Sequence, residues 1–124
     1  MNLHPKIYGK VIVLAPLGRI DHLAAEAFQA AFLPYVDDCS SDYNRIVLDL
    51  SAVEYMSSAG LRVLMIAAKH CQKQNGKVVV AGMQPAMREI FEISRFNLIF
   101  TTYDQVRDAL AALSPDALAA FEGR

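Results

Sequence analysis

The sequence predicts a single α/β domain in which a small mixed β-sheet is covered by about four α-helices. Short apolar runs, mostly of β-branched residues, occur at 11–15, 46–50 and 77–81, as is typical of strands buried on both faces. Segments with the apolar spacing of amphipathic helices separate these runs. The length of 124 residues and the hydrophobic fraction of 54% are enough for one domain to fold alone.

The N-terminal third is expected to form two strands and a helix. A short strand at 6–8 precedes the strand at 11–15. Because Pro16 cannot donate a hydrogen bond to a sheet, we expect the second strand to lie at an edge or to be bulged there. Asp21 is placed to cap a helix over 22–33. The residues expected on the buried face of this helix are Leu23, Ala27, Ala30 and Ala31.

The middle of the chain predicts a βαβ unit. An acidic, polar loop at 37–44 leads into the strand at 46–50. A helix over 58–74 follows, and Asn-Gly at 75–76 ends it because both residues tolerate positive φ. The strand at 77–81 completes the unit, whose crossover should be right-handed. The expected buried face of the helix consists of Leu61, Leu64, Met65 and Ala68, widened by Val63, Ile66 and Ala67.

The C-terminal third is expected to add two helices and a strand. Pro85 suits the first turn of a helix over 86–94, which should bury Met87, Ile90 and Phe91, while the side on which Ile93 lies stays open. A strand at 98–100 and a helix at 104–113 complete the domain, which we assign to residues 1–113. The alternatives for residues 114–124 are a frayed tail, a short extra helix packed on the core, or a contact of a weak homodimer, and we favour the tail.

The most informative stretch links the second apolar run to the helix that follows it. Asp49 stands near the end of the run, and Ser57 and Ser58 stand where the helix begins. The first backbone N–H groups of a helix lack internal partners, and a serine side chain can accept one of them as an N-cap. A cap is the more common role for a serine in this position. Tyr55 and Met56, just before the serines, either form an exposed contact patch or seal the end of the sheet.

This stretch resembles the signature of the STAS domain family, which is named for sulfate transporters and anti-sigma factor antagonists. Asp49 matches the family's strand-end Asp. Ser58 matches the serine that is phosphorylated in anti-sigma factor antagonists, and Gly60 and Leu61 match the Gly-Leu that opens the helix. With Gly-Arg-Ile-Asp at 18–21, the resemblance extends over roughly residues 11–113 and implies the fold described above.

Two positions depart from the family pattern. Ser57 stands where the family usually has Asp, and Ala59 stands where it has a second Ser or Thr. The phosphate acceptor is therefore retained and its acidic neighbour is lost.

The resemblance implies an anti-sigma factor antagonist in a bacterial partner-switching pathway. The unphosphorylated form would bind an anti-sigma factor that is also a serine kinase, which releases a sigma factor. The kinase would phosphorylate Ser58, with Ser57 as second choice, and a PP2C-type phosphatase would reset the switch. ATP belongs to the kinase, so this chain is not expected to be an enzyme or to hold a cofactor. The residues expected to bind the partner are Ser57, Ser58, Gly60, Leu61 and Arg62.

A second hypothesis is a constitutive STAS scaffold or transport-associated adaptor, in which Ser58 serves only as a helix cap. The lost acidic neighbour at Ser57 favours it. A third hypothesis, an independent hydrolase, lacks a nucleophile elbow and an assignable His–acid pair.

Composition and spacing argue against several other classes. The net charge of −1, with no basic residues interleaved with aromatic ones, disfavours nucleic-acid binding. We expect a cytoplasmic protein without a membrane span or signal peptide. His4, His22 and His70 lack the spacing of metal ligands. Cys39 and Cys71 are far apart in the sequence, and we expect two reduced thiols.

Overall fold

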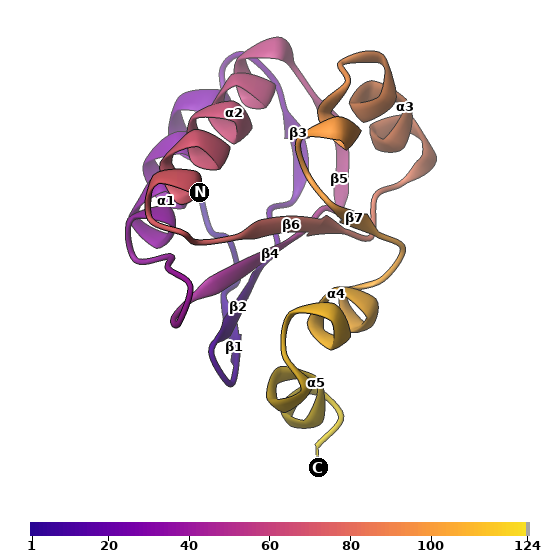
Figure 1. Cartoon of the computed structure of the whole chain (residues 1–124). Coiled ribbons are helices and arrows are strands. Elements are labelled where there is room, and N and C mark those ends of the chain that lie inside the picture. The colour runs from indigo at the N-terminus through magenta and orange to yellow at the C-terminus, as the bar shows by residue number, and fades with distance from the viewer. Residues whose placement is uncertain (124) are drawn as a thin grey trace.

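A mixed five-stranded sheet forms the centre of the computed structural model, which describes residues 1–123 (Figure 1). Along the chain, the elements are β1 (Lys6–Tyr8), β2 (Val11–Leu14), β3 (Gly18–Ile20), α1 (Ala25–Asp37), β4 (Arg45–Asp49), β5 (Val53–Met56), α2 (Ser58–Lys73), β6 (Val78–Ala81), α3 (Pro85–Ile93), the 3₁₀-helix η1 (Phe96–Leu98), β7 (Thr102–Tyr103), α4 (Val106–Leu113) and α5 (Pro115–Phe121).

The predicted α/β class and mixed sheet are confirmed. The strand order is β1-β2-β4-β6-β7, with β1 antiparallel to β2 and the other neighbours parallel. Strands β3 and β5 form a separate parallel pair. Within residues 1–123 there are five α-helices, against the four or so expected, and none is long and apolar enough to cross a membrane.

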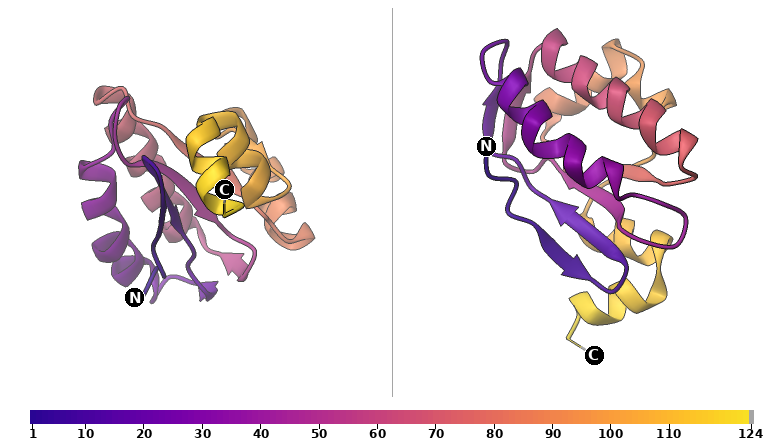
Figure 2. Two further views of the ribbon diagram at one scale, coloured as in Figure 1. Left: turned by 90° about the horizontal axis from the view of Figure 1, so that it is seen from below. Right: turned by 90° about the vertical axis from the view of Figure 1, so that its left-hand side faces the viewer.

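Alternate residues of the central strands face two separate apolar clusters, because successive side chains of a strand point to opposite faces. Helices α1 and α2 lie side by side on one face, and α4 and α5 cover the other (Figure 2). The strand residues on the α1/α2 face are Ile12, Leu14, Ile46, Leu48, Val78 and Val80, and those on the α4/α5 face are Val11, Val13, Val47, Val79 and Ala81.

Three of the four residues predicted on the buried face of α1 are wrong, and only Ala31 packs against the core, partly buried. Leu23 is 87% exposed and precedes the helix, while Ala27 and Ala30 point outward. The helix begins at Ala25, and its register turns the two largest apolar side chains inward, which removes more apolar surface from water than burying alanines would. Asp21 is not the N-cap of α1, which is Ala24, but its Oδ1 accepts from the Ala24 N–H at 2.9 Å and holds the turn before the helix. The buried residues are Ala25, Phe28, Phe32 and Val36.

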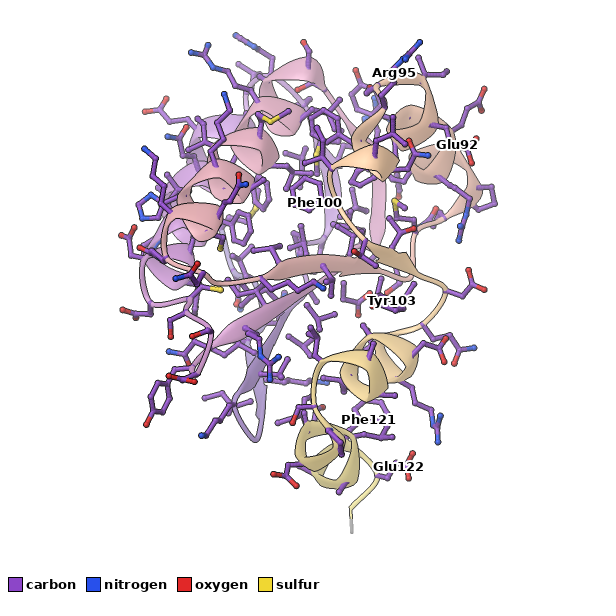
Figure 3. The ribbon with its side chains drawn as sticks, viewed as in Figure 1. Glu92, Arg95, Phe100, Tyr103, Phe121 and Glu122 are labelled. Atoms are coloured by element: carbon purple, nitrogen blue, oxygen red, sulfur yellow. The ribbon has the colours of Figure 1, made fainter. Side chains whose placement is uncertain are left out.

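Two strand predictions also need correction. Strand β2 is not at an edge, since it lies between β1 and β4 and ends at Leu14, so Pro16 is outside the ladder. Residues 98–100 do not form a strand, because η1 follows a left-handed turn at Arg95 (φ 60°) and the last strand begins at Thr102. This path buries the Phe100 side chain (Figure 3) against the rings of Phe91 and Phe96. The apolar residue at this position is therefore removed from water without a strand.

The segment after residue 113 is a packed helix and not the frayed tail that we favoured. Ser114 Oγ caps α5 by accepting from the Ala117 N–H at 3.2 Å, and Ala117 is fully buried. The Phe121 ring (Figure 3) contacts the Tyr8 ring of β1 edge to face, and the two ring centroids are 5.2 Å apart. Helix α5 therefore extends the layer that α4 begins, and the homodimer stays a prediction.

Candidate functional site

The start of α2 is fixed by Ser57. Its backbone is extended (φ −75°, ψ 170°), and its Oγ accepts from the Gly60 N–H at 3.3 Å. Its own N–H donates to the carbonyl of Ile20, at the end of β3, at 2.9 Å. Ser57 is therefore the N-cap, and the β3–β5 pair determines where the helix emerges.

Ser58 has a different environment from its neighbour. It is the first residue of α2 and is exposed. Its Oγ makes no hydrogen bond to any other residue within 1–123. Since Ser57 already supplies the cap, the Ser58 hydroxyl is accessible to a second protein at the end of a helix whose N–H groups and dipole favour anions.

Ser58 opens onto a groove of about 670 Å³ between α1 and α2. Arg62, one helical turn after Ser58, lines the same groove and is exposed. His22 and Glu26 line it from the side of α1. The wide, shallow opening and its mixed charges suit a protein surface or segment better than an enclosed small molecule.

Gly60 and Leu61 face the interior and not the groove. A Cβ on Gly60 would lie 2.6 Å from Met56 Cγ and 3.1 Å from Ile20 Cγ2, so the first turn of α2 needs glycine to approach this close. Leu61 belongs to the buried cluster under α1 and α2. Direct binding of a partner by Gly60 and Leu61 stays a prediction. From their buried positions, the two residues can support binding by holding the exposed residues of the first turn in place.

The two residues before the serines differ in their contacts. Met56 is almost fully buried and seals the end of the sheet. Tyr55 is half-buried, and the Arg19 guanidinium lies 4.6 Å from its ring centroid. Neither residue therefore adds a large apolar patch to the surface beside Ser58.

Asp49 organises the turn after β4. Its Oδ1 accepts from the Ser51 N–H at 3.0 Å, and a Cβ on Gly82 would lie 3.0 Å from the same oxygen. Gln84 then donates through Nε2 to the Ser51 carbonyl at 2.8 Å. These contacts tie the loop after β6 to the turn after β4, so the role of Asp49 in the structure is to hold the turn that leads into β5 and α2.

Sequence reasoning missed the α1 side of the groove. His22, Glu26 and Gln29 have the spacing of one helical face, but only the packing of α1 against α2 shows that this face adjoins Ser58. No group of three His, Cys, Asp or Glu side chains within residues 1–123 could hold a metal ion.

Comparisons with known proteins agree with the fold and with the family resemblance. The family model described as the STAS domain matches residues 2–109. A protein of Bordetella bronchiseptica that carries the name anti-sigma factor antagonist BtrV is 38% identical over 113 residues, which are 91% of this chain and 93% of the relative.

Solved structures extend the likeness. An anti-sigma factor antagonist from Mycobacterium paratuberculosis is 30% identical with a TM-score of 0.77, covering 88% of this chain and 90% of that one. A structure of the Bacillus cell fate determinant SpoIIAA in its phosphorylated form is 16% identical with a TM-score of 0.66, covering 90% of this chain and 98% of that one, and shares the fold.

Proposed function

The chain belongs to the STAS domain family, and from that membership we propose that it is an anti-sigma factor antagonist controlled by phosphorylation of Ser58. Its unphosphorylated form binds an anti-sigma factor that is also a serine kinase, so that a sigma factor is released. The names of the more similar relatives support the antagonist role. The site of action is then the cytoplasm, where bacterial transcription takes place.

The proposal rests on one observation, which is that Ser57 and Ser58 have different roles in the structure. Ser57 caps α2, which leaves the exposed Ser58 hydroxyl without a structural task within residues 1–123. A kinase can therefore modify Ser58 without removing a hydrogen bond that the fold uses. The same observation makes Ser57, whose Oγ is occupied, the second choice.

Phosphorylation changes the charge of the groove. The Ser58 oxygen attacks the γ-phosphorus of ATP bound to the kinase, the P–O bond to ADP breaks, and the hydroxyl proton leaves to a base of the kinase. The product carries about −1.5 to −2 charges at neutral pH. The helix N-terminus and Arg62, one turn away, stabilise this charge within the domain.

A bound partner would have to accommodate that charge. Burying the phosphate costs its hydration, and Arg62 is then drawn to the phosphate and away from any carboxylate of the partner. A loss of about 3 kcal/mol in binding free energy lowers affinity more than a hundredfold. The complex dissociates, and a PP2C-type phosphatase that hydrolyses the phosphoserine restores binding.

The serine at position 57 is compatible with this mechanism. Asp and Ser are both strong N-cap residues, and Ser57 makes the capping hydrogen bond that an Asp would make there. The replacement keeps the geometry of the helix start and removes one negative charge beside Ser58.

A pull-down with mass spectrometry tests the proposal. Wild type, Ser58→Ala and Ser58→Asp serve as baits in lysate from the native host. We expect wild type and Ser58→Ala to retain an anti-sigma factor with a kinase domain, Ser58→Asp to lose it, and wild-type bait to carry phosphate on Ser58.

Ser41→Asp is the matched control, because Ser41 is exposed in the loop after α1 and receives the same charge. It should bind like wild type. Equal capture of one partner by all four baits, with no phosphate on Ser58, would instead identify a constitutive adaptor.

A further inference from the structure

Two cysteines that are far apart in the sequence meet in the interior, at the end of the α1/α2 layer opposite Ser58. Cys39 follows the end of α1 and is fully buried, and Cys71 lies in the last turn of α2 and is 3% exposed. Gly76 lies against both residues. Its N–H donates to the Cys71 carbonyl at 2.9 Å, and a Cβ on it would lie 2.8 Å from Cys39 Sγ.

Cys71 lies close enough to Cys39 to change its acidity. Hydrogen bonding with the Cys71 side chain lowers the pKa of Cys39 to about 7, and the same interaction raises the pKa of Cys71. Arg45 adds a positive charge beside Cys39. Its buried Nε has no hydrogen-bond partner within residues 1–123, which leaves that charge poorly compensated. Cationic neighbours of this kind favour the thiolate, the reactive form of cysteine.

A pocket opens to the surface beside Cys71. Cys39 does not line it but lies against Gly76, which does. The pocket has a volume of about 260 Å³ and is lined in part by Cys71, Gly76 and Lys77. Lys77 also accepts a hydrogen bond from Cys39 Sγ through its carbonyl, at 3.4 Å. Hydrogen peroxide is little larger than water, which occupies about 30 Å³ in the liquid, so it fits within the pocket.

We propose that Cys39 and Cys71 form a reversible intramolecular disulfide when the protein meets hydrogen peroxide. The Cys39 thiolate attacks one peroxide oxygen, the O–O bond breaks, and the departing hydroxide takes a proton to become water. Cys71 loses its proton and attacks the sulfur of the resulting sulfenic acid, the S–S bond forms, and the second oxygen leaves as water. Two thiols are oxidised and one peroxide is reduced to two waters.

The disulfide would tie the end of α1 to the end of α2. Cys71 is the thirteenth residue after Ser58 in α2, a distance of about 20 Å along the helix axis at 1.5 Å per residue. The thiol pair is therefore a separate site, and its oxidation does not depend on the proposed phosphorylation. The cross-link restricts the unfolded chain, and we expect Tm to rise by on the order of 10 °C.

The test uses the unmodified chain, reduced and then exposed to hydrogen peroxide. Intact mass should fall by two hydrogen atoms, and digestion under non-reducing conditions should release a peptide that joins Cys39 to Cys71. Dithiothreitol should restore the original mass and Tm. Two thiols that still react with iodoacetamide in the denatured protein, sulfinic acid, or a disulfide between chains would each overturn the proposal.

Three variants test whether the disulfide forms between these two cysteines and independently of Ser58. Cys39→Ser and Cys71→Ser should each abolish the loss of two hydrogens. Ser58→Ala should form the disulfide as wild type does, because Ser58 lies at the other end of α2. Failure of a cysteine variant to fold leaves the wild-type mass measurement as the deciding result.

Discussion

The two serines at the start of α2 are chemically identical and structurally different. Ser57 has an extended backbone and a hydrogen-bonded Oγ, whereas Ser58 is helical and exposed. One oxygen is used by the fold and the other is available to a partner.

Removing each hydroxyl separately should reveal this difference. We expect Ser57→Ala to reduce the free energy of unfolding by about 1 kcal/mol, since an orphan N–H loses its acceptor. Ser58→Ala should change it by less than about 0.5 kcal/mol, as exposed substitutions do. Urea unfolding monitored by circular dichroism measures both. A larger loss for Ser58→Ala would mean that Ser58 is the cap.

Gly60 lies where there is no room for a larger side chain. Its Cα faces Met56 and Ile20 at the closest approach of α2 to the β3–β5 pair. Its φ is not positive, so backbone conformation does not require glycine here.

Gly60→Ala therefore tests packing directly. We expect it to destabilise the domain by roughly 1–3 kcal/mol from overpacking, reduced by about 1 kcal/mol from the better helix propensity of alanine. Ala59→Gly in the same turn, measured in parallel by urea unfolding, gives the propensity contribution alone. A Gly60→Ala variant more stable than wild type would contradict the close approach.

At the scale of elements, α1 illustrates how register decides which face is buried. Its inner stripe holds two stacked phenylalanine rings with centroids 5.3 Å apart, packed on the α2 side of the sheet. Ala27 and Ala30, which also fit a helical period, lie toward solvent.

Substitutions on the two candidate faces distinguish these registers. Phe32→Ala should lower the free energy of unfolding by about 3–5 kcal/mol, because the ring is fully buried and a cavity remains. Leu23→Ala should change it by less than about 0.5 kcal/mol, since Leu23 is 87% exposed. Comparable losses for the two variants in thermal or urea unfolding would argue for the register first predicted from the sequence.

At the scale of the whole molecule, the two faces of the sheet have separate surroundings. The groove with Ser58 belongs to the α1/α2 layer, and α4 and α5 cover the opposite face (Figure 2). A new charge at Ser58 enters solvent at the rim of one layer and does not reach either apolar cluster.

We accordingly expect a negative charge at position 58 to leave the fold intact. Ser58→Asp should match wild type in unfolding free energy or exceed it by about 0.3–1 kcal/mol, because an acidic side chain in the first turn interacts favourably with the helix dipole. Far-ultraviolet circular dichroism and urea unfolding measure this, with Ser41→Asp as the charge control. Marked destabilisation by Ser58→Asp would mean that any lost binding reflects unfolding.

The fold class, the central βαβ unit and the position of the serine motif could all be predicted from the amino-acid sequence. The apolar runs that became β2, β4 and β6 could be buried on both faces only inside a covered sheet, and the stripe of α2 was wide enough to determine its inner face. Local chemistry also predicted a serine cap at the start of α2, because a cap depends on neighbours within three residues.

Long-range packing set the register of α1, the β3–β5 pair, the path through η1 and the docking of α5. Each depends on which distant apolar surface a segment meets, and that choice overrides local propensity. The groove beside Ser58 and the meeting of Cys39 with Cys71 arise for the same reason, since both require two helices to pack together. Spacing along a chain does not encode such contacts, because packing brings together residues that the sequence keeps far apart.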